Sequence, residues 1–431
     1  MGADLFTNDR PGGMLEHIDG GGRMKKRTIV SLIVIALFCA YGPAFAQGQK
    51  EIVNLLSLHE GTLPVVEPAA YGGWPAAALL DDSPETGWAC ETGNTKDNVF
   101  VFELIAPAVV ERFEFDNAHV DDDGASAKDI SVEVSATSMK TGFETVLKAT
   151  LKDRTDRQGF KAAKAVNGRW LRLTIHANYG SESWTELLSF RGYGYMPPAG
   201  APLENISGTY DSSYSKFHVR QQGTALVGCY EFDNGLLNGA IEGRLMKIAW
   251  QEAGGNKQGL AVMVFAPDGK DFRGYWWTSG KEKGAPDGDW EGKKLSSEVG
   301  GCPHWSGSLS GEVKKKLLSE GRARVYGILF DIDSAVIRPE SKPVLEEVLG
   351  VLKDEPGWKV TIEGHTDSSG DGSHNLTLSQ QRADSVKAYL VAGGIDSGRL
   401  KTKGFGAGKP VADNASELGR AQNRRVELVR E

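Results

Sequence analysis

The sequence predicts a multidomain protein with an N-terminal β-sandwich, a middle antiparallel β meander or small barrel, and a C-terminal two-layer α/β domain. Three observations predict this fold class. Polar and apolar residues alternate in short runs through the first two segments, as in half-buried strands. The last segment alternates strand and helix patterns. A Pro-rich stretch at 197–202 and a Gly/Ser-rich stretch at 296–311 separate the segments, so we expect domains at 50–195, 205–305 and 322–431.

The N-terminus has the layout of a secretory signal peptide. Met24 is followed by the basic run Lys25–Arg27, by an apolar stretch at 29–40, and by the small-residue cleavage pattern Ala44-Phe45-Ala46. The residues before Met24 do not fit this layout. We therefore expect translation to start at Met24 and cleavage to follow Ala46. Residues 1–46 would then be a misplaced start plus a signal peptide, and the mature chain would be exported.

Charge and cysteine content narrow the partners and the compartment. The chain has 49 basic and 57 acidic residues and a net charge of −8. This disfavours nucleic acid as a partner, because binding phosphates needs a basic field. Export permits disulfides. Cys229 and Cys302 flank one β-rich segment and are the preferred pair, and Cys90 is then expected to be a small buried thiol.

The first segment has the pattern of a β-sandwich, because its alternating runs have a period of two and are separated by Gly, Asp and Pro. The runs lie at 99–102, 130–134 and 170–175. The motifs Leu80–Trp88, Gly168–Arg172 and Trp184–Phe190 resemble the discoidin-like family, which is the coagulation factor 5/8 type C or galactose-binding-like jelly roll. This resemblance spans nearly the whole segment.

The resemblance implies a structural calcium ion whose ligands come from the first loop and the last strand, namely Asp81, Ser83, Thr86 and Glu186. Calcium prefers hard oxygen ligands, including carboxylates and carbonyls. The alternative is an Asx-type turn with a solvated Glu186. Tyr71 and Trp74 could stack on a sugar ring or pack in the core. The ligand of this domain therefore stays open.

The middle segment is punctuated by hairpin signals, which are strongest at Asn234-Gly235 and Asp268-Gly269. Strand patterns lie around them, at 224–230, 245–252, 260–265 and 272–278. Short strands joined by tight turns predict a compact meander or a small up-and-down barrel. Four tryptophans could line a ligand cavity, but a filled aromatic core is the favoured interpretation. They are Trp250, Trp276, Trp277 and Trp290.

The third segment alternates strands with helices, which predicts a two-layer α/β domain with a final edge strand. Strand patterns lie at 325–330, 358–363, 400–405 and 424–429. The helix predicted over 339–355 buries one apolar face, made of Val344, Leu345, Val348, Leu349 and Leu352. Ser379 is expected to cap a second helix, whose inward face is Ala383, Val386 and Leu390.

An ordered set of motifs in this segment matches a known pattern. The set is Gly364-His365-Thr366-Asp367, Asn375, Leu378-Ser379, Arg382-Ala383, Gly404-Phe405-Gly406 and Asn423–Glu427. In order and interval these residues resemble the peptidoglycan-binding C-terminal domain of the OmpA, Pal and MotB type, over about residues 322–431. The resemblance implies non-covalent binding of peptidoglycan through the diaminopimelate of its stem peptide.

The family's binding residues correspond here to Asp367 and Arg382. Diaminopimelate ends in an ammonium and a carboxylate on one carbon. Asp367 would accept from the ammonium, and Arg382 would grip the carboxylate through two N–H groups. Arg382 is expected in the first turn of the Ser379-capped helix, whose free N–H groups favour the same anion. The alternative is that Asp367 and Arg382 pair with each other. Further contacts are expected from Thr366, Asn375, Leu378 and Arg425, with Arg424 pointing away.

These features predict an exported, non-enzymatic protein of the periplasm that anchors its β domains to peptidoglycan, either free of the outer membrane or associated with it. A second partner would be a glycan, a lipid or another envelope protein, and no cofactor is required beyond the structural calcium. One alternative is an accessory protein of a wall-associated carbohydrate-processing or hydrolytic enzyme. Another is a wall spacer whose β domains bind nothing. No serine nucleophile elbow or recognisable Cys/His pair in the sequence indicates catalysis.

Overall fold

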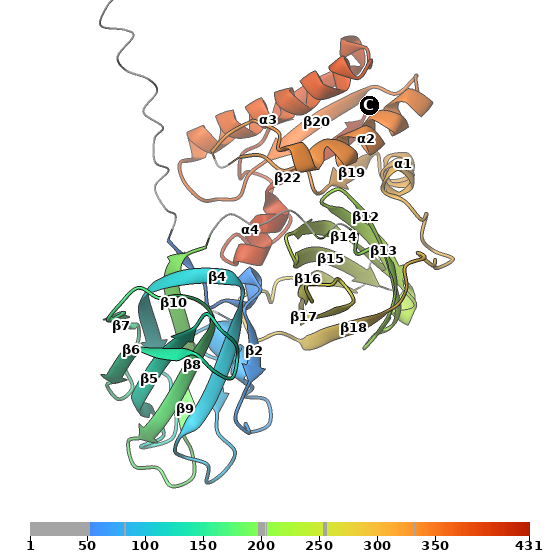
Figure 1. Ribbon diagram of the computed structural model, residues 1–431. Coiled ribbons are helices and arrows are strands. Elements are labelled where there is room, and N and C mark those ends of the chain that lie inside the picture. The colour runs from blue at the N-terminus through green and yellow to red at the C-terminus, as the bar shows by residue number, and fades with distance from the viewer. Residues whose placement is uncertain (1–51, 82, 197–202, 204, 253–256, 332) are drawn as a thin grey trace, which may run out of the picture. The chain divides into compact units, whose positions relative to one another are not determined.

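The computed structural model describes residues 52–431 apart from 82, 197–202, 204, 253–256 and 332 (Figure 1). The predicted start at Met24 and the signal peptide up to Ala46 lie outside the described residues. Within the described part of the chain, no helix has both the length and the apolar character needed to cross a membrane.

The N-terminal part is a β-sandwich, as predicted. Its strands are β1 (Val53–Asn54), β2 (Leu63–Val66), β3 (Trp88–Ala89), β4 (Asn98–Asp116), β5 (Ala127–Ser135), β6 (Phe143–Thr150), β7 (Gln158–Lys161), β8 (Asn167–Asn178), β9 (Glu186–Leu187) and β10 (Ser189–Tyr195). Two 3-10 turns, η1 (Leu58–Glu60) and η2 (Ala76–Leu80), precede β3. The first half of β4 pairs with β2 and β8, and its second half pairs with β7 and β10. One long strand therefore contributes to both layers.

Aromatic side chains fill the space between these layers. Phe100 and Phe102, from the first half of β4, meet Phe113 and Phe115, from the second half, through Phe190 of β10. All five rings are fully buried. A buried Phe side chain contributes about 1.5–3 kcal/mol relative to an exposed one, so this cluster stabilises the sandwich. The period-two alternation in the sequence directs these rings inward.

The middle part is a closed barrel of antiparallel strands, made of β11 (Gly208–Ser212), β12 (Ser215–Gln222), β13 (Ala225–Tyr230), β14 (Gly235–Glu242), β15 (Leu245–Glu252), β16 (Lys257–Phe265), β17 (Asp271–Thr278) and β18 (Gly288–Ser296). A 3-10 turn, η3 (Phe232–Asn234), follows β13. The barrel closes because β18 pairs with β11, which settles the choice between meander and barrel.

The barrel core is filled, as the favoured interpretation expected. Trp250 and Trp290 are buried in it, and Trp276 packs against it. Trp277 is not part of that core. It follows Trp276 in β17, and successive side chains of a strand point to opposite faces, so the prediction that all four tryptophans share one core was wrong for Trp277.

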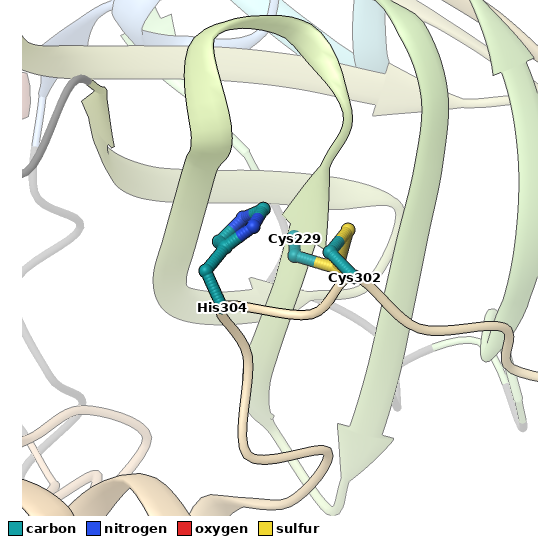
Figure 2. Close-up of side chains that lie close together, drawn as sticks. All are labelled: Cys229, Cys302 and His304. Carbon is teal, nitrogen blue, oxygen red and sulfur yellow. A yellow bond between two sulfur atoms is a disulfide. The ribbon is translucent and has the colours of Figure 1, made fainter.

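A disulfide joins Cys229 to Cys302. Cys229 lies fully buried in β13, and Cys302 lies in the segment that follows β18 (Figure 2). Beside them, Nε2 of His304 lies 3.0 Å from the Gly235 carbonyl oxygen. The disulfide thus links the segment that follows β18 to strand β13. Cys90 is a free, buried thiol, as expected.

The C-terminal part is the predicted two-layer α/β domain. Its helices are α1 (Leu309–Ser319), α2 (Lys342–Asp354), α3 (Gly372–Ala392) and α4 (Glu417–Asn423), with 3-10 turns η5 (Pro339–Ser341) and η6 (Ser397–Arg399). Its strands are β19 (Arg322–Val325), β20 (Val360–His365), β21 (Leu400–Gly404) and β22 (Arg425–Arg430). The sheet order is β19-β22-β20-β21, with β20 and β21 parallel. The prediction of a final edge strand was wrong, because the last strand, β22, pairs with both β19 and β20 and so lies inside the sheet.

The buried faces of α2 and α3 are those that the periodicity predicts, and they enclose one core with the sheet (Figure 1). Two helices differ from the prediction. Helix α1 was not predicted, because it begins at the end of the Gly/Ser-rich stretch and lies between the two predicted domains 205–305 and 322–431. Helix α3 begins at Gly372 under an Asp371 cap, not at Ser379.

Candidate functional site

Asp367 lies two residues after β20, on the loop that leads to α3, and is 8% exposed. Its Oδ1 accepts a hydrogen bond from the Ser369 backbone N–H (2.8 Å), and its Oδ2 accepts one from Nη1 of Arg424 (2.8 Å). Burial alone would raise the pKa of Asp367, but the hydrogen bonds from Arg424 and Ser369 outweigh it and hold that pKa below its ordinary value. Asp367 is therefore an anion near neutral pH.

Arg382 brings a partly buried guanidinium to the same place. Its Nε donates to the Ser334 carbonyl oxygen (3.0 Å), and its guanidinium lies 5.0 Å from the centre of the Phe330 ring. Burial, followed by repulsion from Arg424, lowers the pKa of Arg382, while the charge of Asp367 acts in the opposite direction. Across the described residues, no oxygen accepts a hydrogen bond from the two Nη groups of Arg382. The site therefore holds a cation with unused donors.

Asp367 and Arg382 do not pair with each other, so the alternative interpretation of these two residues was wrong. The partner of Asp367 is Arg424 instead. The site thus contains one carboxylate and two guanidiniums, and the surplus positive charge lies with Arg382. This arrangement suits a ligand that presents both a carboxylate and a cationic group.

The predicted roles of Arg424 and Arg425 were reversed. Arg424 was expected to point away, yet it reaches Asp367. Arg425 was expected to reach the cleft, yet it is 5% exposed and donates from Nε to Glu427 (2.7 Å) and from Nη2 to the Lys409 carbonyl oxygen (3.0 Å). The reason is the strand boundary. Strand β22 begins at Arg425, so Arg424, at the end of α4, does not follow the alternation assumed for it.

The predicted helix contribution to anion binding was also wrong. Helix α3 starts at Gly372, so Arg382 lies well inside it. The N–H groups of Ser373 and His374 are satisfied by the Asp371 carboxylate. Ser379, within the helix, donates from Oγ to the Leu376 carbonyl oxygen and accepts from the Gly406 N–H. The Asp371 cap thus takes up two N–H groups of the helix terminus, which lies ten residues before Arg382.

The remaining predicted residues shape the loop around Asp367. Asn375 is 5% exposed and donates from Nδ2 to the Ser369 carbonyl oxygen (2.7 Å). The Thr366 backbone N–H donates to the Gly406 carbonyl oxygen (3.0 Å), and Leu378 is 8% exposed. These residues fix the backbone on which Asp367 is presented. Whether they touch a ligand stays a prediction.

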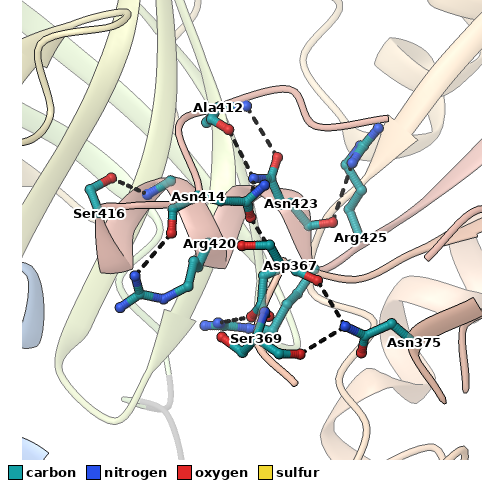
Figure 3. A network of polar contacts seen from close by, with 12 residues as sticks. Asp367, Ser369, Asn375, Ala412, Asn414, Ser416, Arg420, Asn423 and Arg425 are labelled. Atoms are coloured by element: carbon teal, nitrogen blue, oxygen red, sulfur yellow. Dashed lines mark hydrogen bonds and ion pairs between the residues drawn. The ribbon is translucent and has the colours of Figure 1, made fainter. Parts of the chain in front are cut away.

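Two asparagines, for which the sequence pattern predicted no role, extend this network (Figure 3). Asn414 accepts at Oδ1 from the Ser368 N–H (3.1 Å) and from Nδ2 of Asn423 (2.9 Å). Asn423 also accepts at Oδ1 from the backbone N–H groups of Val411 and Ala412. Asn423 belongs to the ordered motif set, so its spacing from Asp367 was the available signal. They connect the loop after β20 to the segment before α4.

A second polar cluster in this domain contains Glu363, His365 and Glu427, whose ligand atoms lie within 4.8 Å of one another. Its carboxylates already pair with arginines, Glu363 with Arg322 and Glu427 with Arg322 and Arg425. Burial and the nearby Arg425 lower the pKa of His365 to about 4. A metal cation placed here would meet these guanidinium charges, so the cluster is better explained as a charge-balanced structural element.

The residues predicted to bind calcium lie in the turn at Asp81 and at the start of β9, where Glu186 is found. Both carboxylate oxygens of Asp81 accept hydrogen bonds within its own turn, from the Ser83 N–H (2.9 Å) and the Thr86 hydroxyl (2.7 Å). This is the Asx-type turn of the alternative interpretation. Glu186, however, is 9% exposed rather than solvated. Burial, with the neighbouring charges of Asp122 and Asp121, raises the pKa of Glu186 to about 7, which is an environment that a dication would relieve.

Comparisons with known proteins agree with this architecture. A model described as the OmpA family matches residues 329–424, and one described as the F5/8 type C domain matches residues 65–190. The "Probable lipoprotein YiaD" of Escherichia coli K12 is 45% identical over 102 residues, covering 24% of this chain and 47% of that protein. The peptidoglycan-binding protein ArfA of Mycobacterium tuberculosis is 44% identical over 102 residues, covering 24% and 31%.

Among solved structures, the peptidoglycan-associated lipoprotein from Burkholderia pseudomallei is 34% identical, with a TM-score of 0.23. The match covers 24% of this chain and 88% of that one. This chain spans less than half the length of the two curated relatives. The similarity to all three proteins is therefore confined to a part of this chain.

Proposed function

We propose that this protein, which carries an OmpA family domain at its C-terminal end and an F5/8 type C domain near its N-terminal end, binds peptidoglycan non-covalently in the bacterial cell envelope. The OmpA family domain binds the wall and anchors the two β domains there, where they provide a surface for a second partner. The name of the relative ArfA, a peptidoglycan-binding protein, supports the wall as partner, and the lipoprotein relatives support an envelope location.

The ligand group is the free end of diaminopimelate, which carries an ammonium and a carboxylate on one carbon. Asp367, ionised and 8% exposed, accepts from the ammonium. The Nη groups of Arg382 bind the carboxylate through two parallel hydrogen bonds. The observation that carries this assignment is the partly buried Arg382, whose Nη donors no described oxygen accepts, beside an anionic Asp367. A desolvated cation with unused donors gains more from an incoming carboxylate than an exposed one does.

The test is calorimetric titration of the full chain with meso-diaminopimelate, with Nα-acetyl-L-lysine amide and with pimelate. We expect heat of binding with diaminopimelate. Pimelate, which lacks both ammonium groups, should bind at least tenfold more weakly, because a charge-assisted hydrogen bond contributes about 1.5–3 kcal/mol. The blocked lysine has a lone side-chain ammonium and no carboxylate, and it serves as the matched control. Equal affinity for all three compounds would contradict zwitterion recognition.

The Arg424 side chain should set the lower pH limit of binding. Binding needs an ionised Asp367, and the hydrogen bond from Arg424 is the largest influence that keeps its pKa low. In Arg424→Ala the hydrogen bonds from Ser369 and the charge of Arg382 oppose burial without the contribution of Arg424, so the pKa of Asp367 rises. We expect diaminopimelate binding to be lost at a higher pH than in the wild type as the pH falls from 7 to 3.5.

Arg424→Lys, which keeps the positive charge, should show a smaller displacement of that midpoint. The measurement is the affinity for diaminopimelate at half-unit pH steps. An unchanged midpoint in Arg424→Ala would show that Arg424 does not control the charge of Asp367. Both variants lie at an exposed position, so the fold should be retained.

We further propose that Glu186 and the turn at Asp81 hold calcium in the sandwich. The raised pKa of Glu186 means that the folded state holds this proton, so its contribution to stability is lost as the pH rises through about 7. Calcium would replace the proton. At pH 8 we expect calcium to raise the melting temperature of the wild type but not of Glu186→Gln. A wild-type melting temperature that responds to neither calcium nor EDTA would count against the ion.

A further inference from the structure

One end of the barrel collects every second hairpin turn, because consecutive strands run in opposite directions. Among the described residues, the turns after β11, β13 and β17 lie at this end, which we name the barrel mouth. They bring together residues that are distant in the sequence. The ion pair between Lys257 Nζ and Asp233 Oδ2 (3.2 Å), for example, joins the start of β16 to the turn after β13.

Aromatic rings run continuously from the barrel core to the surface at the mouth. Trp290, which is 2% exposed, lies at the inner end, and its ring centre is 5.3 Å from that of Tyr214. Tyr214 also touches Trp276 (6.1 Å) and Phe232 (5.9 Å). Tyr214 and Trp276 are half-buried, and Phe232 is 46% exposed. A single exposed Phe would need no explanation, but here it ends a ring cluster.

Polar groups lie among these rings. The Tyr214 hydroxyl accepts from Nε1 of Trp276 (2.8 Å) and, as a hydroxyl, can still donate. Glu252 is 9% exposed, and its Oε1 accepts from the Tyr230 hydroxyl (2.9 Å). No group of the described residues donates a hydrogen bond to Oε2 of Glu252. The mouth therefore combines half-exposed ring surface with a nearly buried acceptor that has spare capacity.

The charges at the mouth select the ligand class. Lys257 forms an ion pair with Asp233. Lys281 forms an ion pair with Asp287 in the turn between β17 and β18. Lys216 lies beside Glu231 and offsets its charge. The nearly buried Glu252 forms no ion pair within the described residues, and its negative charge disfavours phosphate, sulfate or carboxylate ligands next to it. The filled core leaves no room for a ligand inside the barrel. A ligand at the mouth must therefore lie on the rings of Tyr214 and Phe232 and donate a hydrogen bond to Glu252.

We infer that the barrel mouth binds a neutral glycan, with the C–H face of a pyranose ring on Phe232 and Tyr214 and a sugar hydroxyl donating to Glu252. A pyranose has one apolar face and a rim of hydroxyl groups, which matches ring surface bordered by a carboxylate. An apolar peptide would leave Glu252 without a donor, and an unpaired buried acceptor costs about 1–3 kcal/mol. This site is independent of Asp367 and Arg382, so either assignment can fail alone.

The experiment titrates the full chain with chitotetraose and with cellotetraose, following tryptophan fluorescence and heat. All measurements use the Tyr71→Ala background, so that an exposed aromatic of the sandwich does not contribute. We expect saturable quenching by at least one tetrasaccharide. Phe232→Ala should weaken that binding at least fivefold. Glu252→Gln, which keeps the shape and can still accept from Tyr230, should weaken it at least threefold.

The matched control is Leu295→Ala, because Leu295 is 58% exposed and lies near the end of β18 that is remote from the mouth. It should bind like its parent. The absence of quenching and heat with both tetrasaccharides would overturn the inference. Equal affinity of Phe232→Ala and its parent would also overturn it, as would binding of an apolar peptide of similar size without binding of either sugar.

Discussion

Replacing Arg382 with alanine is expected to abolish co-sedimentation of the protein with purified peptidoglycan sacculi. Arg382 is partly buried, Phe330 and Ser334 hold it in place, and its Nη groups are the ones proposed to bind the ligand carboxylate. Truncating one partner of a buried, hydrogen-bonded charge pair costs about 2–5 kcal/mol. At about 1.4 kcal/mol per tenfold change in affinity, this predicts at least a thirtyfold weaker affinity for diaminopimelate.

The same loss is expected for Asp367→Ala, by a different route. Without this carboxylate the ligand ammonium has no anion to bind, and the ion pair with Arg424 is lost. Asparagine has nearly the size of aspartate without its charge, so Asp367→Asn separates the effect of charge from that of shape. This variant should bind peptidoglycan almost as weakly as Asp367→Ala.

The control for both changes is Lys387→Ala, which removes a positive charge from α3 one and a half turns after Arg382. It should sediment with sacculi like the wild type. Wild-type retention of both Arg382→Ala and Asp367→Ala would refute the proposed site. Circular dichroism should show an unchanged fold, because neither side chain belongs to the apolar core.

Removing the disulfide is expected to give the largest loss of stability. The two cysteines are 73 residues apart in the sequence, and a cross-link over a loop of this length stabilises a folded protein by about 4 kcal/mol in the chain-entropy model. The double variant Cys229→Ser/Cys302→Ser should therefore unfold at a lower urea concentration. Cys229 is fully buried in β13, so a serine hydroxyl there adds a further penalty unless it finds a partner.

The matched measurement is unfolding of the wild type with and without a dithiol reductant. The reductant should lower the wild-type midpoint towards that of the double variant and leave the double variant unchanged. Identical midpoints for the oxidised wild type and the double variant would show that the bridge does not stabilise the barrel. Binding to sacculi should persist in the double variant at low temperature, because Asp367 and Arg382 lie outside the linked segment.

The sequence predicted the three folds because each depends on a local repeating pattern. Period-two alternation placed Phe100, Phe102 and their neighbours between two layers, and the 3.6-residue period placed Val344 and Leu345 on the buried face of α2. It predicted less well where local signals compete. Asp371 and Ser379 are both good caps, and choosing Ser379 shortened α3 and put Arg382 at its start.

The pairing of cations in the site could not be read from the sequence. Alternation along a strand predicts one face for Arg425 and the other for Arg424, but only if both lie in the strand. The chain leaves α4 at Arg424 and enters β22 at Arg425. That single boundary sends Arg424 to Asp367 and buries Arg425 against Glu427.

The sequence by itself determined which residue types this protein has available: an acid and a base at the spacing of a peptidoglycan-binding motif, two cysteines around a β segment, and aromatic residues in a run of short strands. The tertiary structure alone decided which of them meet. It pairs Asp367 with Arg424, leaves the Nη donors of Arg382 without an acceptor among the described residues, and brings Tyr214, Phe232 and Glu252 to one end of a barrel. The physical reason is that these contacts depend on strand ends and turns, where a shift of one residue redirects a side chain and no periodic pattern constrains it.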